Sequence, residues 1–291
     1  MRVTPWHQTN WDWRAAGNFI GGGSGTGLLF FATLASGSVE AYRVQALIAL
    51  ALIGLGLTCV WAEIGRPLRA LNVFRHPQTS WMTREGMVAP FLFLAALVAI
   101  WQGGGALAGV VALLGLVFLY CQARILHAAK GIPAWREPKI VPLILATGFV
   151  EGAGLSSLLA VLLPGNGPRW LAGILLGALI LRRLAWGMYR DALERKGAPK
   201  KTLETLQGFG ARYEMFGQLA AEMLIVGAIF MGGAAFPFLV ALAGLVAVAS
   251  GWALKFTIVT RAAYNQGFAL PVLPVRGQGE AKPGVKPGWS K

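Results

Sequence analysis

Long apolar stretches alternate with short polar ones along this 291-residue chain. A helix needs about 20 mostly apolar residues to cross the roughly 30 Å hydrocarbon core of a bilayer. Eight stretches reach or approach that length, and the third is short. They cover residues 15–35, 44–62, 87–101, 105–126, 140–163, 170–189, 214–235 and 236–259. The pattern predicts an all-α integral membrane protein, a bundle of about eight transmembrane helices.

Composition and charge refine this picture. The chain is 56% hydrophobic and only 13% charged, with a net charge of +14, whereas soluble domains are about 25% charged. The basic excess does not point to nucleic acid. It lies in the N-terminal segment, in the connections after the second, fourth and sixth apolar stretches, and in the C-terminal tail. These segments all fall on one side of the membrane, and only Arg43 and Arg169 fall on the opposite side. The positive-inside rule therefore predicts that both termini are cytoplasmic.

The first apolar stretch contains a glycine-rich segment, Gly21–Gly27. It lacks the preceding strand and the following lysine of a nucleotide-binding loop. Gly21 and Gly25 are four residues apart, as are Gly23 and Gly27, and this spacing lets two helix backbones approach closely. Close helix packing is therefore the better interpretation.

Histidine and cysteine are too few and too scattered to hold a redox metal. A membrane b-type haem takes two axial histidines from facing helices, but no two of the three histidines, His7, His76 and His127, fall within the apolar stretches. An iron–sulfur cluster takes four thiolates. The only cysteines are Cys59 and Cys121, which we interpret as small packing residues. The sequence predicts no haem, no iron–sulfur cluster and no metal site in this chain.

Polar residues gather where the second apolar stretch reaches the predicted inner boundary. Pro67 is expected to end that helix, which leaves Glu63 about one turn before it, with Arg66 nearby. A carboxylate there can exchange a proton with a quinone carbonyl while an arginine holds the developing charge. The alternative is an interfacial Glu–Arg pair that only shapes the connection. Asn18, near the same boundary, needs a hydrogen-bond partner, which is either another helix or a quinone oxygen.

A second polar face ends the fourth apolar stretch. Tyr120, Arg124 and His127 stand at i, i+4 and i+7, which places them on one face of a helix. A phenol, a guanidinium and an imidazole at this depth suit a quinone head group. Ordinary extension of Arg and His toward the lipid head groups is an equally good interpretation.

Four charged residues lie deeper in the apolar stretches, namely Glu151, Glu222, Arg182 and Arg183. A charge at the bilayer centre costs at least about 2.5–3.5 kcal/mol, so these side chains are expected to face the bundle interior and to be paired. They form either a proton route between the quinone site and one membrane face, or buried ion pairs that fix helix packing. The sequence leaves both interpretations open.

With these residues in view, the chain resembles the polysulfide reductase/NrfD and dimethyl sulfoxide reductase anchor families. The resemblance rests on eight spans without haem, the glycine-rich first helix, the pattern Glu-x-Gly-Arg-Pro-x-Arg-Ala-x-Asn over residues 63–72, and the stretch Ser80–Glu85. It implies a haem-free anchor subunit of a molybdopterin (Mo/W) oxidoreductase in a bacterial or archaeal inner membrane. Such a subunit exchanges electrons between menaquinone or ubiquinone and a docked, ferredoxin-like iron–sulfur subunit, next to the molybdopterin catalytic subunit.

By position, the resemblance makes Glu63 the acid or base of the quinone site, Asn18 a quinone contact and Tyr120 its phenol. The other expected quinone contacts are Arg66, Arg124 and His127. Dimethyl sulfoxide reductase anchors have His where this chain has Glu63. The opening segment Asn10–Gly23 further resembles the membrane subunit of phenylacetyl-CoA:acceptor oxidoreductases, which implies a cytosolic CoA thioester as the substrate of the complex.

The expected quinone-binding membrane domain covers residues 1–264. Residues 265–291 form a Pro/Gly/Lys-rich cytoplasmic tail that either covers a partner or is disordered. A competing function is a secondary transporter that uses the buried Glu and Arg residues, although the sequence has no convincing internal repeat of the kind found in many transporters. A third is a structural anchor without quinone, in which replacing Glu63 by Gln leaves quinone-coupled turnover unchanged.

Overall fold

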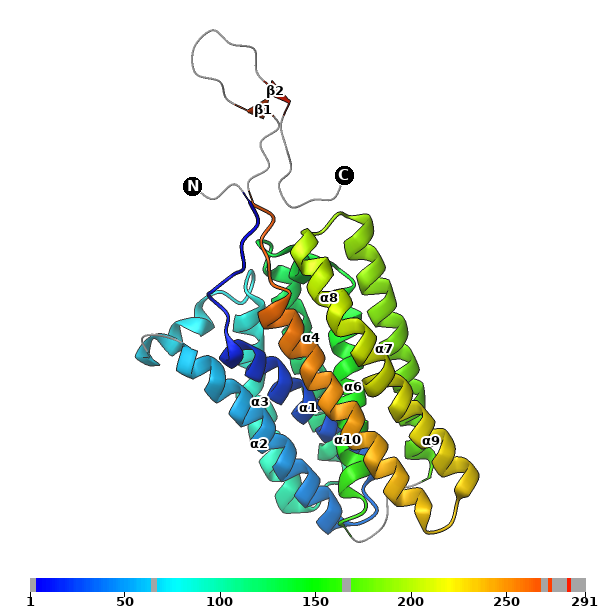
Figure 1. The fold of residues 1–291 in the computed structure, drawn as a ribbon. Helices are drawn as coiled ribbons and strands as arrows, with labels where there is room; N and C mark the ends of the chain where they lie inside the picture. Colours follow the sequence, from blue (N-terminus) through cyan, green and yellow to red (C-terminus); the bar gives the residue numbers. More distant parts are fainter. Residues whose placement is uncertain (1–3, 64–66, 164–168, 268–271, 274–281, 284–291) are drawn as a thin grey trace.

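The computed structural model describes residues 4–63, 67–163, 169–267, 272–273 and 282–283, and within them the chain forms a bundle of long helices lying side by side (Figure 1). The long elements are α1 (Trp13–Ala35), α2 (Val39–Glu63), α3 (Trp81–Gln102), α4 (Ala106–Ala128), α6 (Ile140–Leu159), α7 (Trp170–Arg195), α8 (Lys200–Arg212), α9 (Ala220–Met231) and α10 (Ala235–Phe256). The short elements are the 3₁₀ helix η1 (Pro67–Arg75), α5 (Pro133–Arg136), the π-helical turns η2 (Tyr213–Leu219) and η3 (Thr257–Arg261), and the strands β1 (Val272–Leu273) and β2 (Lys282–Pro283).

Seven helical segments in the described part are long and apolar enough to cross a membrane. One of them joins α8, η2 and α9, and another joins α10 and η3. The glycine-rich helix α1 is not among the seven, but it is 23 residues long. It lies inside the bundle, packed against α2, α4, α6 and α10. With α1 included, the described chain has the all-α, eight-helix membrane fold that the sequence predicts.

Two of the predicted helix boundaries are wrong. The third helix begins at Trp81 rather than at residue 87, because the Ser80 hydroxyl accepts a hydrogen bond from the Thr83 amide at 3.2 Å and caps it. The predicted connection over 190–213 is mostly helical, since α7 runs on to Arg195 and α8 begins at Lys200. Lys, Arg and Glu are good helix formers, so both helices extend beyond their apolar parts.

The two described ends of the chain meet at one end of the bundle, which we call the terminal end; the opposite end is the far end. The backbone N–H of Gln8 donates to the Ala263 carbonyl at 2.9 Å, and the backbone N–H of Asn265 donates to the Trp6 carbonyl at 3.1 Å. Helix α2 also ends here, before Pro67, as predicted. An even number of crossings places both ends on one side. That this side is cytoplasmic stays a prediction.

At the far end, α9 and α10 are joined by a turn of only a few residues. Gly232 and Gly233 both have positive φ angles, 57° and 55°, a conformation that glycine adopts without steric cost. The seventh and eighth predicted stretches therefore fold back on each other as two antiparallel helices.

Candidate functional site

The glycines of α1 let it lie inside the bundle. A Cβ atom at Gly21 would lie 2.4 Å from the Leu52 carbonyl oxygen of α2, and one at Gly25 would lie 2.5 Å from the Ala49 carbonyl oxygen. Only glycine fits at such distances. The predicted role of Gly21 and Gly25 in close helix packing is confirmed.

Two consecutive glycines of α1 face polar side chains instead of backbone. A Cβ atom at Gly22 would lie 2.1 Å from Gln122 Nε2 of α4, and one at Gly23 would lie 2.2 Å from Lys255 Nζ of α10. The missing side chains thus make room for two polar groups at neighbouring positions around α1. Each of these groups belongs to a separate cluster.

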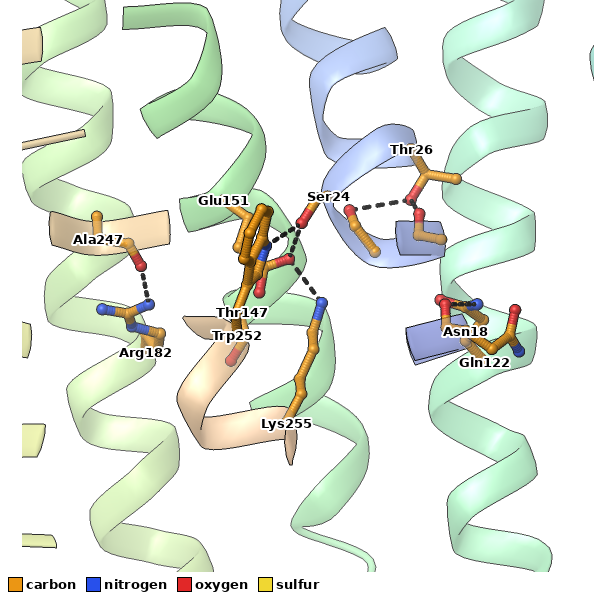
Figure 2. Close-up of polar contacts among 12 residues, drawn as sticks. Asn18, Ser24, Thr26, Gln122, Thr147, Glu151, Arg182, Ala247, Trp252 and Lys255 are labelled. Atoms are coloured by element: carbon orange, nitrogen blue, oxygen red, sulfur yellow. Dashed lines mark hydrogen bonds and ion pairs between the residues drawn. The ribbon is translucent and has the colours of Figure 1, made fainter. Parts of the chain in front are cut away.

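The first cluster, called here the central cluster, consists of Ser24, Glu151, Trp252 and Lys255 (Figure 2). Lys255 Nζ donates to Glu151 Oε2 at 2.6 Å, and the side chains of both residues are fully buried. The Ser24 hydroxyl donates to the same oxygen at 2.8 Å and accepts from the Trp252 indole at 2.8 Å. Glu151 is therefore paired inside the bundle, as expected, but its partner is a lysine that the sequence did not single out.

The neighbouring arginines of α7 point in different directions. Arg182 is fully buried and donates to neutral acceptors, which include the Gln218 Oε1 atom at 2.6 Å and the Ala247 carbonyl at 2.9 Å (Figure 2). Arg183 forms an ion pair with Glu222 at 2.7 Å, with the arginine side chain 43% exposed. The prediction that Arg183 faces the interior is wrong, because consecutive residues lie about 100° apart around a helix.

The second cluster, called here the amide–carboxyl cluster, consists of Asn18, Glu85 and Gln122, which are all buried. Asn18 Nδ2 donates to Glu85 Oε1 at 3.5 Å, and Gln122 Nε2 donates to the backbone carbonyl oxygen of Asn18 at 3.0 Å. Helices α1, α3 and α4 each supply one of these side chains. A carboxyl group at this position, held by amides, can take up or release a proton away from bulk water.

An aromatic and basic surface, called here the rim, borders the amide–carboxyl cluster. Its members are Trp81, Arg84, Tyr120 and Arg124. The guanidinium carbons of Arg84 and Arg124 lie 4.0 and 4.5 Å from the Trp81 ring centroid. Arg124 also donates to the Tyr120 hydroxyl at 2.8 Å. Trp81 of the rim and Glu85 of the amide–carboxyl cluster stand four residues apart in α3 and therefore share one face of that helix. The predicted residues Asn18, Tyr120 and Arg124 all fall in this region.

Glu63, the predicted acid or base of the quinone site, lies closer to the terminal end. Gly56 of α2 lies against the backbone of Asn18. Glu63 is seven residues further along α2, roughly 10 Å by helical rise. There Arg14 donates to the Ala62 carbonyl at 2.7 Å, and its hydrogen bonds to Asp12 hold the pKa of that carboxyl below its usual value. Arg66 lies outside the described residues, so its role, like that of Glu63, stays a prediction.

His127 is partly exposed at the end of α4. Within the described residues, no group of three or more His, Cys, Asp or Glu side chains is arranged to hold a metal ion. The predicted absence of haem and iron–sulfur clusters is not tested by this arrangement and stays a prediction. The far end has a cavity of about 420 Å³ lined by Ser157, Arg169 and Phe236 among others, and none of the candidate residues lines it.

Five residues of the two clusters were not singled out as site residues from the sequence, namely Ser24, Glu85, Gln122, Trp252 and Lys255. Glu85 entered only as part of the stretch Ser80–Glu85, and Ser24 only as part of the glycine-rich segment Gly21–Gly27. Glu85, Gln122 and Lys255 are polar residues in membrane-spanning segments, which is itself a signal of function. The sequence does not show which of them meet, because that depends on how the helices are rotated against one another.

Comparison with known proteins places the chain near membrane anchor subunits. The sequence profile of the family described as DMSO reductase anchor subunit (DmsC) matches residues 14–181, more than half of the chain. One sulfite dehydrogenase subunit from Allochromatium vinosum is 33% identical over 135 residues, which cover 40% of this chain and 42% of that protein. The alignment thus spans less than half of the curated relative. The DmsC match includes the amide–carboxyl cluster and Glu151 but ends before Lys255.

Proposed function

Because the chain belongs to the DMSO reductase anchor subunit (DmsC) family, we propose that it is the quinone-reactive membrane subunit of a molybdopterin oxidoreductase. In this role it passes electrons between a membrane quinone and an iron–sulfur cluster in a ferredoxin-like subunit docked on it. The substrate is converted by the molybdopterin subunit. The observation that carries this proposal is the amide–carboxyl cluster, a buried carboxyl group held between two amides beside an aromatic and basic rim.

A quinone head group fits these residues chemically. The amide oxygens of Asn18 and Gln122 are buried and have no hydrogen-bond partner among the described residues. Leaving such an acceptor unpaired is costly, and the hydroxyl groups of a quinol are suitable donors. The partly exposed ring of Tyr120 offers an aromatic face on which a quinone ring can stack.

A bound quinone supplies the two-electron chemistry, and each reduction consumes two protons. We assign proton exchange with a quinone oxygen to Glu85, since it is a buried carboxyl group in the cluster. Arg84 and Arg124 stabilise negative charge that develops on the ring oxygens. The amides of Asn18 and Gln122 orient the head group. Glu63, nearer the terminal end, is the proposed link between this site and water.

The electron-transfer partner is proposed to dock at the terminal end of the bundle. The amide–carboxyl cluster is closer to this end than to the far end, because Asn18 lies in the first two turns of α1 and Glu85 in the first two turns of α3. The exposed basic residues of this end include Lys130 and Lys201, which suit an acidic partner surface. An electron path from a docked cluster to the rim is shortest here.

The substrate of the complex is set by its catalytic subunit. The resemblance to phenylacetyl-CoA:acceptor oxidoreductases favours a CoA thioester, whereas the relative from A. vinosum is named for sulfite. We propose phenylacetyl-CoA as the first substrate to assay and sulfite as the second. Reduction of a quinone by either would fit the role of the anchor.

Photoaffinity labelling tests the proposed quinone site. A photoreactive short-chain quinone is added to membranes that contain the tagged chain, and the labelled peptides are identified by mass spectrometry. The expected labels fall in Trp81–Glu85 and Tyr120–Arg124, and excess unlabelled quinone prevents them. Labels confined to the far end would contradict the proposal.

Co-purification separates the proposed function from the alternative of a secondary transporter. The tagged chain is expected to purify with iron–sulfur and molybdenum- or tungsten-containing subunits, detected by metal analysis. A transporter would purify without them. Recovery of the intact, folded chain alone under mild detergent conditions would therefore count against an anchor subunit.

A further inference from the structure

The quinone chemistry proposed above leaves the central cluster without a role. Glu151 and Lys255 are fully buried in the bundle, and removing two charges from water is costly even when they are paired. The surrounding sequence leaves space for them: a Cβ atom at Gly251 would lie 2.6 Å from Glu151 Oε1, just as one at Gly23 would lie 2.2 Å from Lys255 Nζ. Three helices, α1, α6 and α10, are thus shaped around this pair.

The hydrogen bonds of Glu151 are uneven. Its Oε2 atom accepts from both Lys255 and Ser24, whereas its Oε1 atom is buried and has no partner among the described residues. A purely structural ion pair is most stable when every acceptor is satisfied. The free oxygen gives this carboxyl group a position at which it can accept a proton or donate one to water.

The pair can rearrange its proton without changing the buried charge. When the Lys255 ammonium gives a proton to Glu151 Oε2, an N–H bond breaks, an O–H bond forms, and an ion pair becomes a neutral pair. The net charge is zero in both forms. Arg182 on α7 is a further buried cation, and its own hydrogen bonds go to neutral acceptors such as the Ala247 carbonyl.

The central cluster lies close to the amide–carboxyl cluster. Gln122 Nε2 and Lys255 Nζ lie 2.1 and 2.2 Å from the Cβ positions of the consecutive residues Gly22 and Gly23. Since consecutive Cα atoms are 3.80 Å apart, the two nitrogens are separated by about 11 Å at most. At hydrogen-bonding distances of about 2.8 Å, a chain of roughly three water molecules would be needed to span that gap. In Figure 2, Glu151 and Lys255 lie on one side of α1 and Gln122 lies on the other.

We propose that Glu151 and Lys255 form an internal proton-exchange site that passes protons along α1 to and from the amide–carboxyl cluster. The proposal rests on the proposed quinone function, since quinone reduction is the reaction that consumes the protons. On quinone reduction, Glu151 in its acid form releases its proton through water toward Glu85: the O–H bond breaks and leaves a carboxylate, to which Ser24 donates, beside the neutral Lys255 amine. A proton taken up from water by the Lys255 nitrogen then restores the ion pair. On quinol oxidation the steps run in reverse. Glu151 and Lys255 are proton-relay residues that do not touch the quinone.

Infrared difference spectroscopy tests this directly. The purified complex in lipid vesicles, with a short-chain ubiquinone, is reduced and oxidised electrochemically. The wild-type spectrum is expected to contain a carboxyl C=O band that is absent in Glu151→Gln and shifted in Lys255→Met. Glu204→Gln, an exposed residue of α8, is the matched control and keeps the band. A band unchanged in Glu151→Gln, with quinone bands still present, would overturn the proposal.

A kinetic comparison separates a proton relay from a structural ion pair. Glu151→Gln is expected to lower quinone-coupled turnover by about 100-fold, the lower end of what a positioned proton-transfer group contributes. The double variant Glu151→Gln/Lys255→Met is uncharged and isosteric, so it restores packing but not proton exchange. Turnover near wild-type in the double variant would overturn the relay. If Glu151→Gln does not assemble into the complex, the turnover of the double variant alone distinguishes a proton relay from a structural ion pair.

The glycine at position 23 provides an independent variant. Gly23→Ala displaces the Lys255 ammonium without removing any charge and is expected to lower quinone-coupled turnover. Gly177→Ala, on α7 with nothing within 4 Å of its Cβ position, is the control. Equal turnover in the two variants would contradict the proposal. Failure of wild-type complex to show any quinone bands or turnover would instead refute the quinone function itself, so the two failures are distinguishable.

Discussion

At the scale of single residues, the central cluster makes a prediction about stability. Removing one partner of a buried ion pair leaves an uncompensated charge and typically costs about 3–5 kcal/mol. Lys255→Met should therefore strongly destabilise the chain, and the double variant Glu151→Gln/Lys255→Met should recover most of that loss. Thermal unfolding in detergent measures both. Equal stability of Lys255→Met and wild type would show that Glu151 does not depend on Lys255 in the folded bundle.

The rim predicts a smaller effect on quinone affinity. Tyr120→Phe removes the hydroxyl that Arg124 bonds at 2.8 Å but keeps the ring that stands at 88° to Trp81. A hydrogen bond contributes about 0.5–1.5 kcal/mol, so we expect the KM for quinone to rise about two- to tenfold with little change in kcat. Tyr264→Phe, beside His7 at the terminal end, is the control. A loss of kcat without a change in KM would argue against a binding role.

At the scale of elements, the position of α1 depends on its glycines. Whether a Gly→Ala substitution raises or lowers the free energy of unfolding tests this dependence. In an exposed helix, Ala is more stable than Gly by about 1 kcal/mol, so Gly177→Ala should stabilise the chain slightly. Gly25→Ala should destabilise it by about 1–3 kcal/mol, the usual cost of overpacking, because the new Cβ meets the α2 backbone. Unfolding measurements on both variants check this. A stabilised Gly25→Ala would mean that α1 and α2 are not in close contact.

The sequence predicted the helices of this fold but not the polar contacts between them. Hydrophobic runs and Pro67 predicted the helices and the end of α2, and the four-residue spacing of Gly21 and Gly25 predicted close packing. Polar contacts between helices were not predictable, since hydropathy gives no rotation for a helix that is apolar on most of its faces. Glu151 was therefore recognised as a buried charge that needs a partner, while Lys255 was not recognised as that partner. For the same reason Glu85 was not placed beside Asn18.

At the scale of the whole molecule, the charge distribution predicts the orientation in the membrane. Single cysteines are introduced at Glu204, near the terminal end, and at Glu40, at the far end, in a chain in which Cys59 and Cys121 are replaced by Ser. An impermeant maleimide should label Glu204→Cys only from the cytoplasmic side and Glu40→Cys only from the opposite side. The reversed pattern would place the proposed docking surface outside the cell and contradict a cytosolic partner.

The central claim is that quinone reacts at the amide–carboxyl cluster of this chain, and Glu85→Gln tests it most directly. Two rates are measured in the same purified complex: substrate oxidation with a quinone acceptor, and substrate oxidation with a soluble dye that takes electrons from the partner subunits. We predict that Glu85→Gln lowers the quinone-coupled rate by about 100-fold or more and leaves the dye-coupled rate unchanged. A quinone-coupled rate equal to that of wild type would contradict the account.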